Sequence, residues 1–412
     1  MAKSPNAVLF KGEELDFTAQ SDTAEQQVPD AQINEKYVRG EIRIVTEQAR
    51  YPLNTIKGIV EDPSYKLSPE YQRRHRWSVE QKSRLIESLI MNVPIPPVFL
   101  YEYDYSKYEV MDGLQRLSAI HDFYSDHFDL KGLSHWRELE GRHYSNLPEK
   151  VREGIDRRFL SSVILLKETA KDEEDALRLK QLVFERLNSG GAKLEPQESR
   201  NAIFDGDLNR LCLKLSKNLS LCRLWGIPEP QDAELQGGDA SDERLENDDF
   251  RKMADVELVL RFFAYRQKHR LHKSGVPLSR YLDEYLGHGN RAFSDDTLAG
   301  LERLFLDTIT LVEDVLGEKA FWLYRRRGIK ETRWSWRESA TTAVYDPMML
   351  VFSNHLSDAS ALRQRSGRFQ DEITAFYQDN YSSFEGRNVN PSILIEREDK
   401  IEAFVASVLA QP

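Results

Sequence analysis

The sequence predicts an α+β N-terminal domain followed by an all-α C-terminal domain. Short runs typical of β-strands, such as residues 98–101 and 161–166, occur in the first half. From Phe250 onward the apolar residues recur at helical spacing, and no comparable strand signal is found. The length of 412 residues allows two or three domains of about 100–200 residues each.

The composition is that of a globular protein with a real core, because 40% of the residues are hydrophobic and 30% are charged. The net charge of -11 argues against a protein that grips nucleic acid over its whole surface. We find no apolar run of about 18 residues and no N-terminal signal peptide, so we expect a cytoplasmic protein. Cys212 and Cys222 lack zinc-site spacing and are expected to be buried, reduced thiols.

The N-terminal part is expected to contain a polar arm and then the first ordered elements. Residues 1–40 predict a mobile tail or a loosely docked arm, residues 42–45 a strand, and residues 53–60 a short helix or turn. Ser78 and Gln81 form a capping-box pattern at the start of a helix that Asn92 would end.

The elements that follow are expected to form the rest of the α+β domain. After the rigid connector 94–97, residues 98–101 and 108–111 predict a β-hairpin, and a tight turn then leads into a helix. The expected later elements are a helix at 149–157, a strand at 161–166, a helix at 173–187 ended by residues 188–191, and a helix at 196–203.

The second half is expected to be helical. Residues 229–249 are rich in Pro, Gly and acidic side chains and predict a mobile loop or linker. The domain boundaries that follow are an arm at 1–40, an α+β domain at 41–205 and a helical domain at 206–412.

The turn after the second hairpin strand carries the strongest functional pattern. A strand, a tight glycine turn and a helix together present backbone N–H groups to an anion. Gly113 lets a ligand approach the backbone, and Arg116 follows one helical turn later, where it can pair with a phosphate. Asp112 is suited to hold a hydrated Mg²⁺ ion, and residues 71–77 supply further cations and Trp77 upstream.

The order of these segments resembles the N-terminal domain of ParB proteins, of the ParB/sulfiredoxin-like fold. The segments are Tyr71-Gln72-Arg73, residues 85–88, residues 94–98 and residues 108–116. The run Asp112-Gly113-Leu114-Gln115-Arg116 is closer to the bacterial family marked by a DGQQR motif. That family supplies the NTP-hydrolysing subunit of GmrSD-type modification-dependent restriction systems and related phage-defence proteins.

A second block supports the resemblance. Residues 184–191 are similar to the family's Phe-x-x-x-Asn-x-Gly segment, and residues 194–201 to its Leu-x-x-x-Glu-x-Arg-Asn segment. The resemblance extends over roughly residues 42–205. One departure is Leu114, which replaces the first Gln of the motif; if that amide orients a water, hydrolysis is affected more than binding.

The resemblance implies a site that binds an NTP with Mg²⁺ and hydrolyses it, mostly through positioning and charge stabilisation. The implied catalytic residues are Asp112, Gln115 and Glu198, with Asp112 also the metal ligand. The implied nucleotide-binding residues are Arg73, Gly113, Arg116, Asn188, Gly190, Arg200 and Asn201.

Several of these residues also allow a purely structural interpretation. Arg200 could pair with Asp112 or Glu198, Asn188 could only cap a helix, and Trp77 could belong to the core. A basic and aromatic run suits either DNA backbone binding or a buried helix end; its cations are Arg325, Arg326, Arg327, Lys330 and Arg333. His269 and His272 favour a solvated basic helix face over a metal site.

The leading hypothesis is an NTP-binding and NTP-hydrolysing component of a restriction-type antiphage system that regulates a DNA-acting partner. No nuclease motif is found in the chain, so we expect a partner protein to carry any nuclease activity. One alternative is a non-hydrolysing regulator that binds DNA or a partner. The other is a metal-dependent nuclease that uses Asp112 and Glu198.

Overall fold

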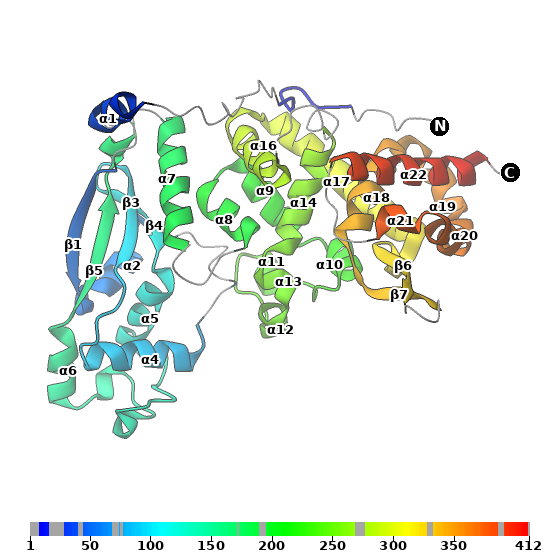
Figure 1. Ribbon diagram of the computed structural model, residues 1–412. Helices are drawn as coiled ribbons and strands as arrows, with labels where there is room; N and C mark the ends of the chain where they lie inside the picture. The colour runs from blue at the N-terminus through cyan, green and yellow to red at the C-terminus, as the bar shows by residue number, and fades with distance from the viewer. Residues whose placement is uncertain are drawn as a thin grey trace. The chain divides into compact units, whose positions relative to one another are not determined.

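The computed structural model describes residues 8–15, 29–39, 44–67, 74, 77–170, 173–188, 195–267, 277–327, 333–385 and 391–410. The chain divides into two compact units (Figure 1). The sheet unit is Asp22–Leu194, and the helical unit combines Met1–Ser21 with Glu195–Pro412. Within the described ranges, no helix is long and apolar enough to cross a membrane.

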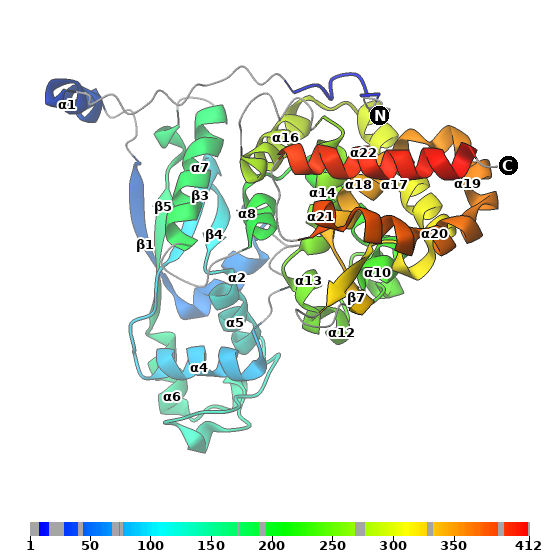
Figure 2. The ribbon, with the colours of Figure 1, turned by 45° about the vertical axis from the view of Figure 1, so that its right-hand side comes forward.

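The sheet unit contains one five-stranded sheet with strand order β1-β5-β3-β4-β2 (Figures 1 and 2). Its elements are α1 Asp30–Arg39, β1 Thr46–Pro52, α2 Ile56–Glu61, β2 Tyr65–Lys66, α4 Val79–Ile90, β3 Val98–Asp104, β4 Lys107–Asp112, α5 Leu114–Tyr124, α6 Glu149–Asp156, β5 Phe159–Leu165 and α7 Glu173–Asn188. Strands β3 and β4 form the expected antiparallel hairpin, and β3 also pairs in parallel with β5.

One face of this sheet carries the hydrophobic core of the unit. Val98, Leu100 and Val110 project from the central strands and pack with apolar side chains of α2, α4 and α5. Because side chains alternate along a strand, Glu109 lies on the other face, where Lys180 of α7 forms a nearly buried ion pair with it at 2.7 Å. The sheet is therefore covered on both faces around β4, the strand that ends at the predicted site.

Most expected elements of this unit are found where the patterns placed them. Ser78 and Gln81 form a complete capping box at the start of α4, and Asn92 adopts a left-handed φ of 60° just beyond its end. The first strand, β1, begins at Thr46. Of the strand predicted at residues 42–45, residues 42 and 43 lie outside the described residues, and residues 44 and 45 precede β1.

The helical unit packs many helices around α14 and α18. Its elements are α8 Pro196–Ile203, α9 Asp207–Leu215, α10 Leu219–Trp225, α11 Asp232–Leu235, α12 Asp242–Glu246, α13 Asp248–Arg251, α14 Ala254–Tyr265, α16 Leu278–Ala292, α17 Asp295–Leu316, β6 Trp322–Arg327, β7 Arg333–Ala340, α18 Thr342–Asn354, α19 Ala359–Gln364, α20 Ser366–Asp379, α21 Tyr381–Phe384 and α22 Pro391–Ala410. Arg261 of α14 and Asp346 of α18 form a buried ion pair inside this core.

The two cysteines behave as predicted, because both are free and buried in the helical unit. Cys212 lies in α9 and Cys222 in α10. Burial raises the pKa of the Cys212 thiol, which keeps it protonated and unreactive.

Residues 8–15 dock on the helical unit, which favours the docked arm over the mobile tail for this stretch. Glu13 is fully buried and accepts hydrogen bonds from Arg266 Nη1 at 2.8 and 2.9 Å. The Gln267 side-chain amide also binds the backbone on both sides, donating to the carbonyl of Glu13 and accepting from the N–H of Leu15. The polar composition of this stretch did not predict that a buried ion pair would hold it in place.

The second half of the chain is helical as predicted, with one correction and one addition. Residues 229–249 are not a structureless linker, because they contain α11 and α12 and bury Arg244 completely, 3.0 Å from Glu234. The acidic residues there serve as helix starts and as partners for this arginine. The helical half is also not purely α-helical, since β6 and β7 pair as an antiparallel hairpin.

Candidate functional site

The predicted phosphate turn joins β4 to α5 in the sheet unit. Asp112 is the last residue of β4, and Gly113 is the N-cap of α5 with a φ of 99°. No side chain caps this helix start, so its first N–H groups lack the usual side-chain acceptor among the described residues. A helix N-terminus of this kind attracts anions through its free N–H groups and its dipole.

Arg116 lies over the turn and is held there by two acceptors. Its Nη2 donates to Asp112 Oδ2 at 2.6 Å, and its Nη1 donates to the backbone carbonyl of Pro96 at 3.1 Å. The Arg116 side chain is 11% exposed, whereas that of Asp112 is 51% exposed. The guanidinium is therefore fixed beside the helix start, while the carboxylate faces solvent.

Gly113 is required by the geometry of the turn. A Cβ atom at this position would lie 2.5 Å from Cγ1 of Val98 and 3.0 Å from Nη2 of Arg116. The positive φ is also unfavourable for residues with a side chain. The glycine thus permits both the turn and the close approach of Arg116.

Leu114 and Gln115, which lie between Gly113 and Arg116, have different surroundings. The Oε1 atom of Gln115 accepts a hydrogen bond from the backbone N–H of Trp77 at 3.3 Å. Leu114 and Trp77 both pack against the apolar core of the unit, half-buried. Leu114 therefore contributes packing where the motif of the similar family has an amide.

Several predicted residues lie outside the described residues. These are Arg73, Arg76, Gly190, Lys330, His269 and His272, and the side chains of Asn188 and Arg327. The backbone of Asn188 is described and is the last residue of α7. Arg74 is described and is buried, with 6% of its surface exposed.

The other predicted site residues belong to α8, in the helical unit: Glu198 as a catalytic residue, and Arg200 and Asn201 as nucleotide-binding residues. Glu198 completes a capping box with the N–H of Glu195 at 2.6 Å and is 2% exposed. Asn201 accepts a hydrogen bond from Asn209 at 2.7 Å. These contacts give both side chains structural partners, and their nucleotide roles stay predictions.

Arg200 sits in a dense polar network of the helical unit. Its guanidinium donates to Asp283 at 2.6 Å, to Glu257 at 2.9 Å and to the side chain of Gln197 at 3.2 Å. Its side chain is only 4% exposed. The partners proposed from sequence, Asp112 or Glu198, are not among these acceptors, so the observed network ties α8 to α14 and α16 instead.

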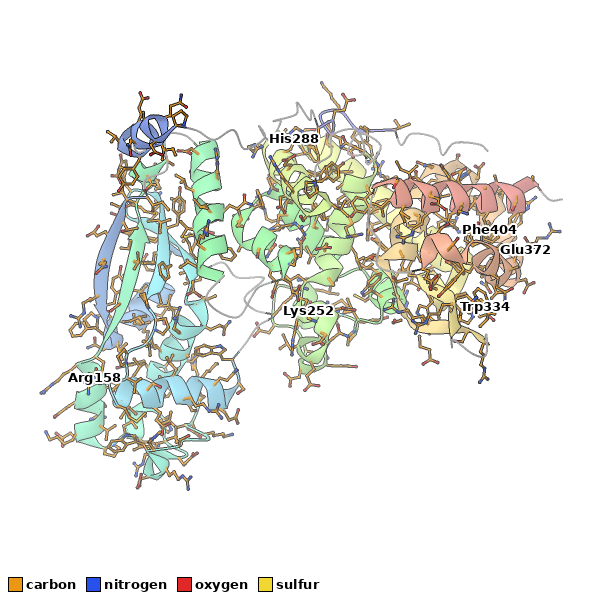
Figure 3. All side chains as sticks on the ribbon, viewed as in Figure 1. Arg158, Lys252, His288, Trp334, Glu372 and Phe404 are labelled. Carbon is orange, nitrogen blue, oxygen red and sulfur yellow. The ribbon has the colours of Figure 1, made fainter. Side chains whose placement is uncertain are left out.

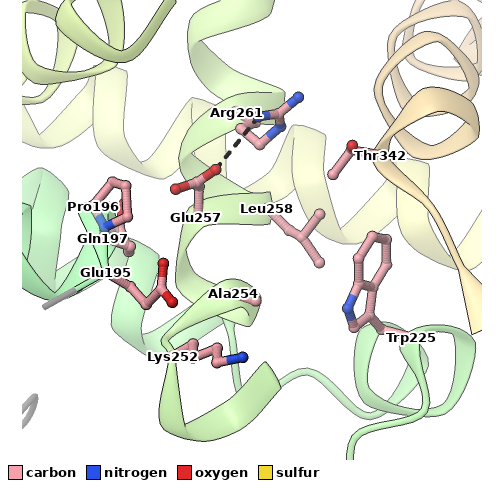
Figure 4. Close-up of a pocket in the computed structure, with 10 residues that line it drawn as sticks. All are labelled: Glu195, Pro196, Gln197, Trp225, Lys252, Ala254, Glu257, Leu258, Arg261 and Thr342. Atoms are coloured by element: carbon pink, nitrogen blue, oxygen red, sulfur yellow. Dashed lines mark hydrogen bonds and ion pairs between the residues drawn. The ribbon is translucent and has the colours of Figure 1, made fainter. Parts of the chain in front are cut away.

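A cavity of about 330 Å³ lies beside this network (Figure 4). It is lined by Glu195, Pro196, Gln197, Trp225, Lys252, Ala254, Glu257, Leu258, Arg261 and Thr342. Figure 4 shows Glu257 reaching toward Arg261, with Trp225 on the opposite side. The cavity itself was not predicted, because its residues come from four separate segments of the chain.

The basic and aromatic run forms the β6–β7 hairpin, whose two faces differ. The pairing places Tyr324, Trp334 and Trp336 on one face, where Tyr324 stacks on Trp334 at 5.8 Å (Trp334 is labelled in Figure 3). Trp334 also meets Tyr381 and Trp336 meets Tyr377, so this face packs within the helical unit. Arg325 and Arg333 belong to the other face, and Arg326 is exposed on the aromatic side.

Comparison with known proteins finds a similarity that covers most of the sheet unit and α8 of the helical unit. Residues 56–204 match the family model of the N-terminal domain of the GmrSD restriction endonuclease. This part of the chain is therefore similar to a domain of a restriction endonuclease. No curated protein and no solved structure matches the chain.

Proposed function

We propose that the protein binds a nucleoside triphosphate with Mg²⁺ at the β4–α5 turn, hydrolyses it, and thereby regulates a DNA-acting partner in a restriction-type defence system. The observation that carries the proposal is the uncapped start of α5 next to a fixed Arg116 and an exposed Asp112. The family match over residues 56–204 supports the restriction-system context.

The phosphate chain would be held by the backbone and by Arg116. The first turn of α5 directs its N–H groups and the positive end of the helix dipole toward the anion, and Gly113 has no side chain that would block the approach of the anion. The carbonyl of Pro96 already orients Arg116, so little side-chain entropy is lost when the guanidinium meets a phosphate. Binding would replace Asp112 as the acceptor for Nη2.

The exposed carboxylate of Asp112 fits a hydrated Mg²⁺ ion. Magnesium in NTP sites is bound by one or two carboxylates together with phosphate oxygens and water, so a single carboxylate suffices. When bound, the ion neutralises charge on the phosphates. Asp112 would turn one oxygen toward the ion and release Arg116 to the phosphate, so that both residues change partners together.

Gln115 would position the attacking water or a phosphate oxygen. Its side chain is anchored beside the turn through Oε1, which accepts from the N–H of Trp77, and an amide group can both donate and accept hydrogen bonds. Leu114 supplies no polar group, so we expect slow turnover that depends on charge stabilisation by Arg116. The helical unit would carry the effect to DNA or to a partner, with Arg325, Arg326 and Arg333 of its hairpin as the DNA contacts.

The test is phosphate release from ATP, GTP, CTP and UTP in the presence of Mg²⁺, with and without DNA. We expect turnover with at least one nucleotide, and its loss in Arg116→Ala and Asp112→Ala. Arg84→Ala, which changes an exposed arginine of α4, is the matched control and should retain turnover. Turnover that survives both site substitutions would refute the site.

A non-hydrolysing regulator is the second candidate, and Leu114 is the observation that favours it. Nucleotide binding that Arg116→Ala abolishes, together with no phosphate release from any nucleotide, would establish this candidate over the hydrolase. The nuclease alternative loses support, because Glu198 is buried and engaged in a capping box. We do not propose it.

A further inference from the structure

A cluster of two histidines and an aspartate lies at the C-terminal end of α5, away from the β4–α5 turn. His121 and Asp122 belong to the last turns of the helix, and His127 follows it. At 1.5 Å per residue, the helix rises about 10 Å from Leu114, its first residue, to His121. The cluster is therefore separate from the proposed nucleotide site.

The chain reversal after α5 brings His127 back to the helix. Asp126 adopts a left-handed φ of 57°, and the N–H of His127 donates to the carbonyl of Asp122 at 2.8 Å. The N–H of Asp126 donates to the carbonyl of Phe123 at 3.1 Å, which completes a Schellman motif. Asp126 is further fixed by the N–H of Ser145. The position of His127 is thus set by backbone hydrogen bonds, not by its own side chain.

The side-chain atoms are spaced as metal ligands are. Asp122 Oδ1 lies 3.3 Å from Nδ1 of His121 and 3.6 Å from Nδ1 of His127. One ligand atom from each of the three residues lies within 4.8 Å of the other two. Two atoms that are each about 2.1 Å from a tetrahedral metal lie about 3.4 Å apart, so the two separations from Asp122 match zinc coordination, and a change in the exposed His127 side chain could close the remaining one.

Neighbouring charges orient two of the three side chains. The Nε2 atom of His121 faces Glu61 Oε1 of α2 at 3.4 Å, which leaves Nδ1 for a metal. Lys82 of α4 binds Oδ2 of Asp122 at 2.8 Å, which leaves Oδ1 for the same ion. Metal-binding histidines characteristically pair their second nitrogen with a carboxylate in this way. Lys82 also adds a positive charge, which the carboxylates of Glu61 and Asp122 together outweigh.

We propose that His121, Asp122 and His127 bind a divalent transition-metal ion of the zinc class. Two imidazoles and one carboxylate suit zinc and its first-row neighbours, whereas magnesium and calcium prefer an all-oxygen set. His127 is 60% exposed, against 18% for His121 and 25% for Asp122. The fourth position therefore faces solvent, open to water or an external ligand, and the ion clamps the reversal that ends α5.

The test is zinc binding by the tag-free, full-length chain in the absence of nucleotide, measured by calorimetry and by metal content after desalting. We expect one Zn²⁺ per chain, an increase in Tm on adding zinc, and a loss of affinity of at least about tenfold in His127→Ala. Because His127 is exposed, the variant should keep the wild-type Tm in chelator. Glu61→Gln should weaken binding less.

His143→Ala is the matched control, since His143 also faces a carboxylate, Asp129 at 3.2 Å, but belongs to no described three-residue cluster. It should bind zinc as the wild type does. Co²⁺ should give visible absorption bands of a four-coordinate site in the wild type and in His143→Ala, but not in His127→Ala. No stoichiometric zinc, or equal affinity in the His127→Ala variant, would overturn the proposal whether or not the chain hydrolyses nucleotides.

Discussion

The Asp112 carboxylate holds the Arg116 guanidinium at 2.6 Å across the start of α5. The carboxylate is half-exposed and the guanidinium is nearly buried, so solvent, metal ions and anions reach this pair from the Asp112 side. An anion that binds the helix start must compete with Asp112 for the arginine. At the proposed site, the pair would thus link metal binding to phosphate binding.

Asp112→Asn should therefore uncouple the binding of the triphosphate from the binding of Mg²⁺. The neutral amide holds Arg116 less strongly than the carboxylate, so triphosphate binding without Mg²⁺ should become several-fold tighter. Mg²⁺ should then no longer improve binding, and turnover should be lost. Titration calorimetry with and without Mg²⁺ measures both effects, with Asp104→Asn, an exposed residue at the far end of β3, as the control. Weaker metal-free binding in Asp112→Asn would contradict this account.

Gly113→Ala should destabilise the sheet unit by about 1–3 kcal/mol. The added methyl group meets Val98 at 2.5 Å and the residue must keep a positive φ, both of which are unfavourable. Gly58→Ala is the matched control, because Gly58 lies within α2 with open space around it and should stabilise by about 0.5–1 kcal/mol. Urea denaturation of both variants measures the two changes in the free energy of unfolding. Equal effects would mean that the turn tolerates a side chain.

Local patterns predicted the elements around the β4–α5 turn well, because the interactions that form these elements join residues close together in the sequence. The capping box of Ser78 with Gln81 spans three residues, and the β3–β4 hairpin and the Gly113 turn are also local. The family resemblance then located Asp112, Gly113 and Arg116 together. The partners of these residues from distant segments, such as the carbonyl of Pro96 for Arg116, could not be read from spacing.

The predictions failed or stayed open where partners lie far apart in the chain. Arg200 pairs with Asp283, which is 83 residues away, and no local pattern indicates this contact. Arg244 is buried inside a stretch whose acidic composition is typical of solvated loops. The three residues of the proposed zinc site lacked a recognised metal spacing, because a left-handed residue after the helix, not a helical repeat, brings His127 to His121.

Arg200→Ala should destabilise the helical unit by about 3–5 kcal/mol, since it removes a guanidinium that is 4% exposed and pairs with Asp283 and Glu257. Arg210→Ala, on the following helix, removes an arginine that is 57% exposed and pairs with Asp205 and Asp207. That change should cost less than about 1 kcal/mol. Thermal and urea unfolding of the two variants should separate them clearly. If both cost the same, the Arg200 network does not stabilise the unit.

His355 should make the helical unit more stable in mildly acidic than in alkaline solution. Its hydrogen bond to Glu402 at 2.8 Å, aided by Asp358, raises its pKa above the ordinary value of 6.5, although burial opposes this. The stabilisation is complete below about pH 6.5 and is lost as the pH rises through the higher folded-state pKa. His355→Gln should flatten the dependence of Tm on pH over this range. Asp358→Asn, which changes the more exposed partner, should flatten it less.

The contact between Glu13 and Arg266 joins residues 253 positions apart and encloses the whole sheet unit between two pieces of the helical unit. During synthesis at about 5–20 residues per second, the N-terminal segment must wait on the order of 10–50 s before Arg266 and Gln267 are made. The sheet unit is synthesised within this interval. Residues 8–15 are thus made long before the residues against which they dock, so a carboxylate that ends fully buried stays in solvent until Arg266 emerges.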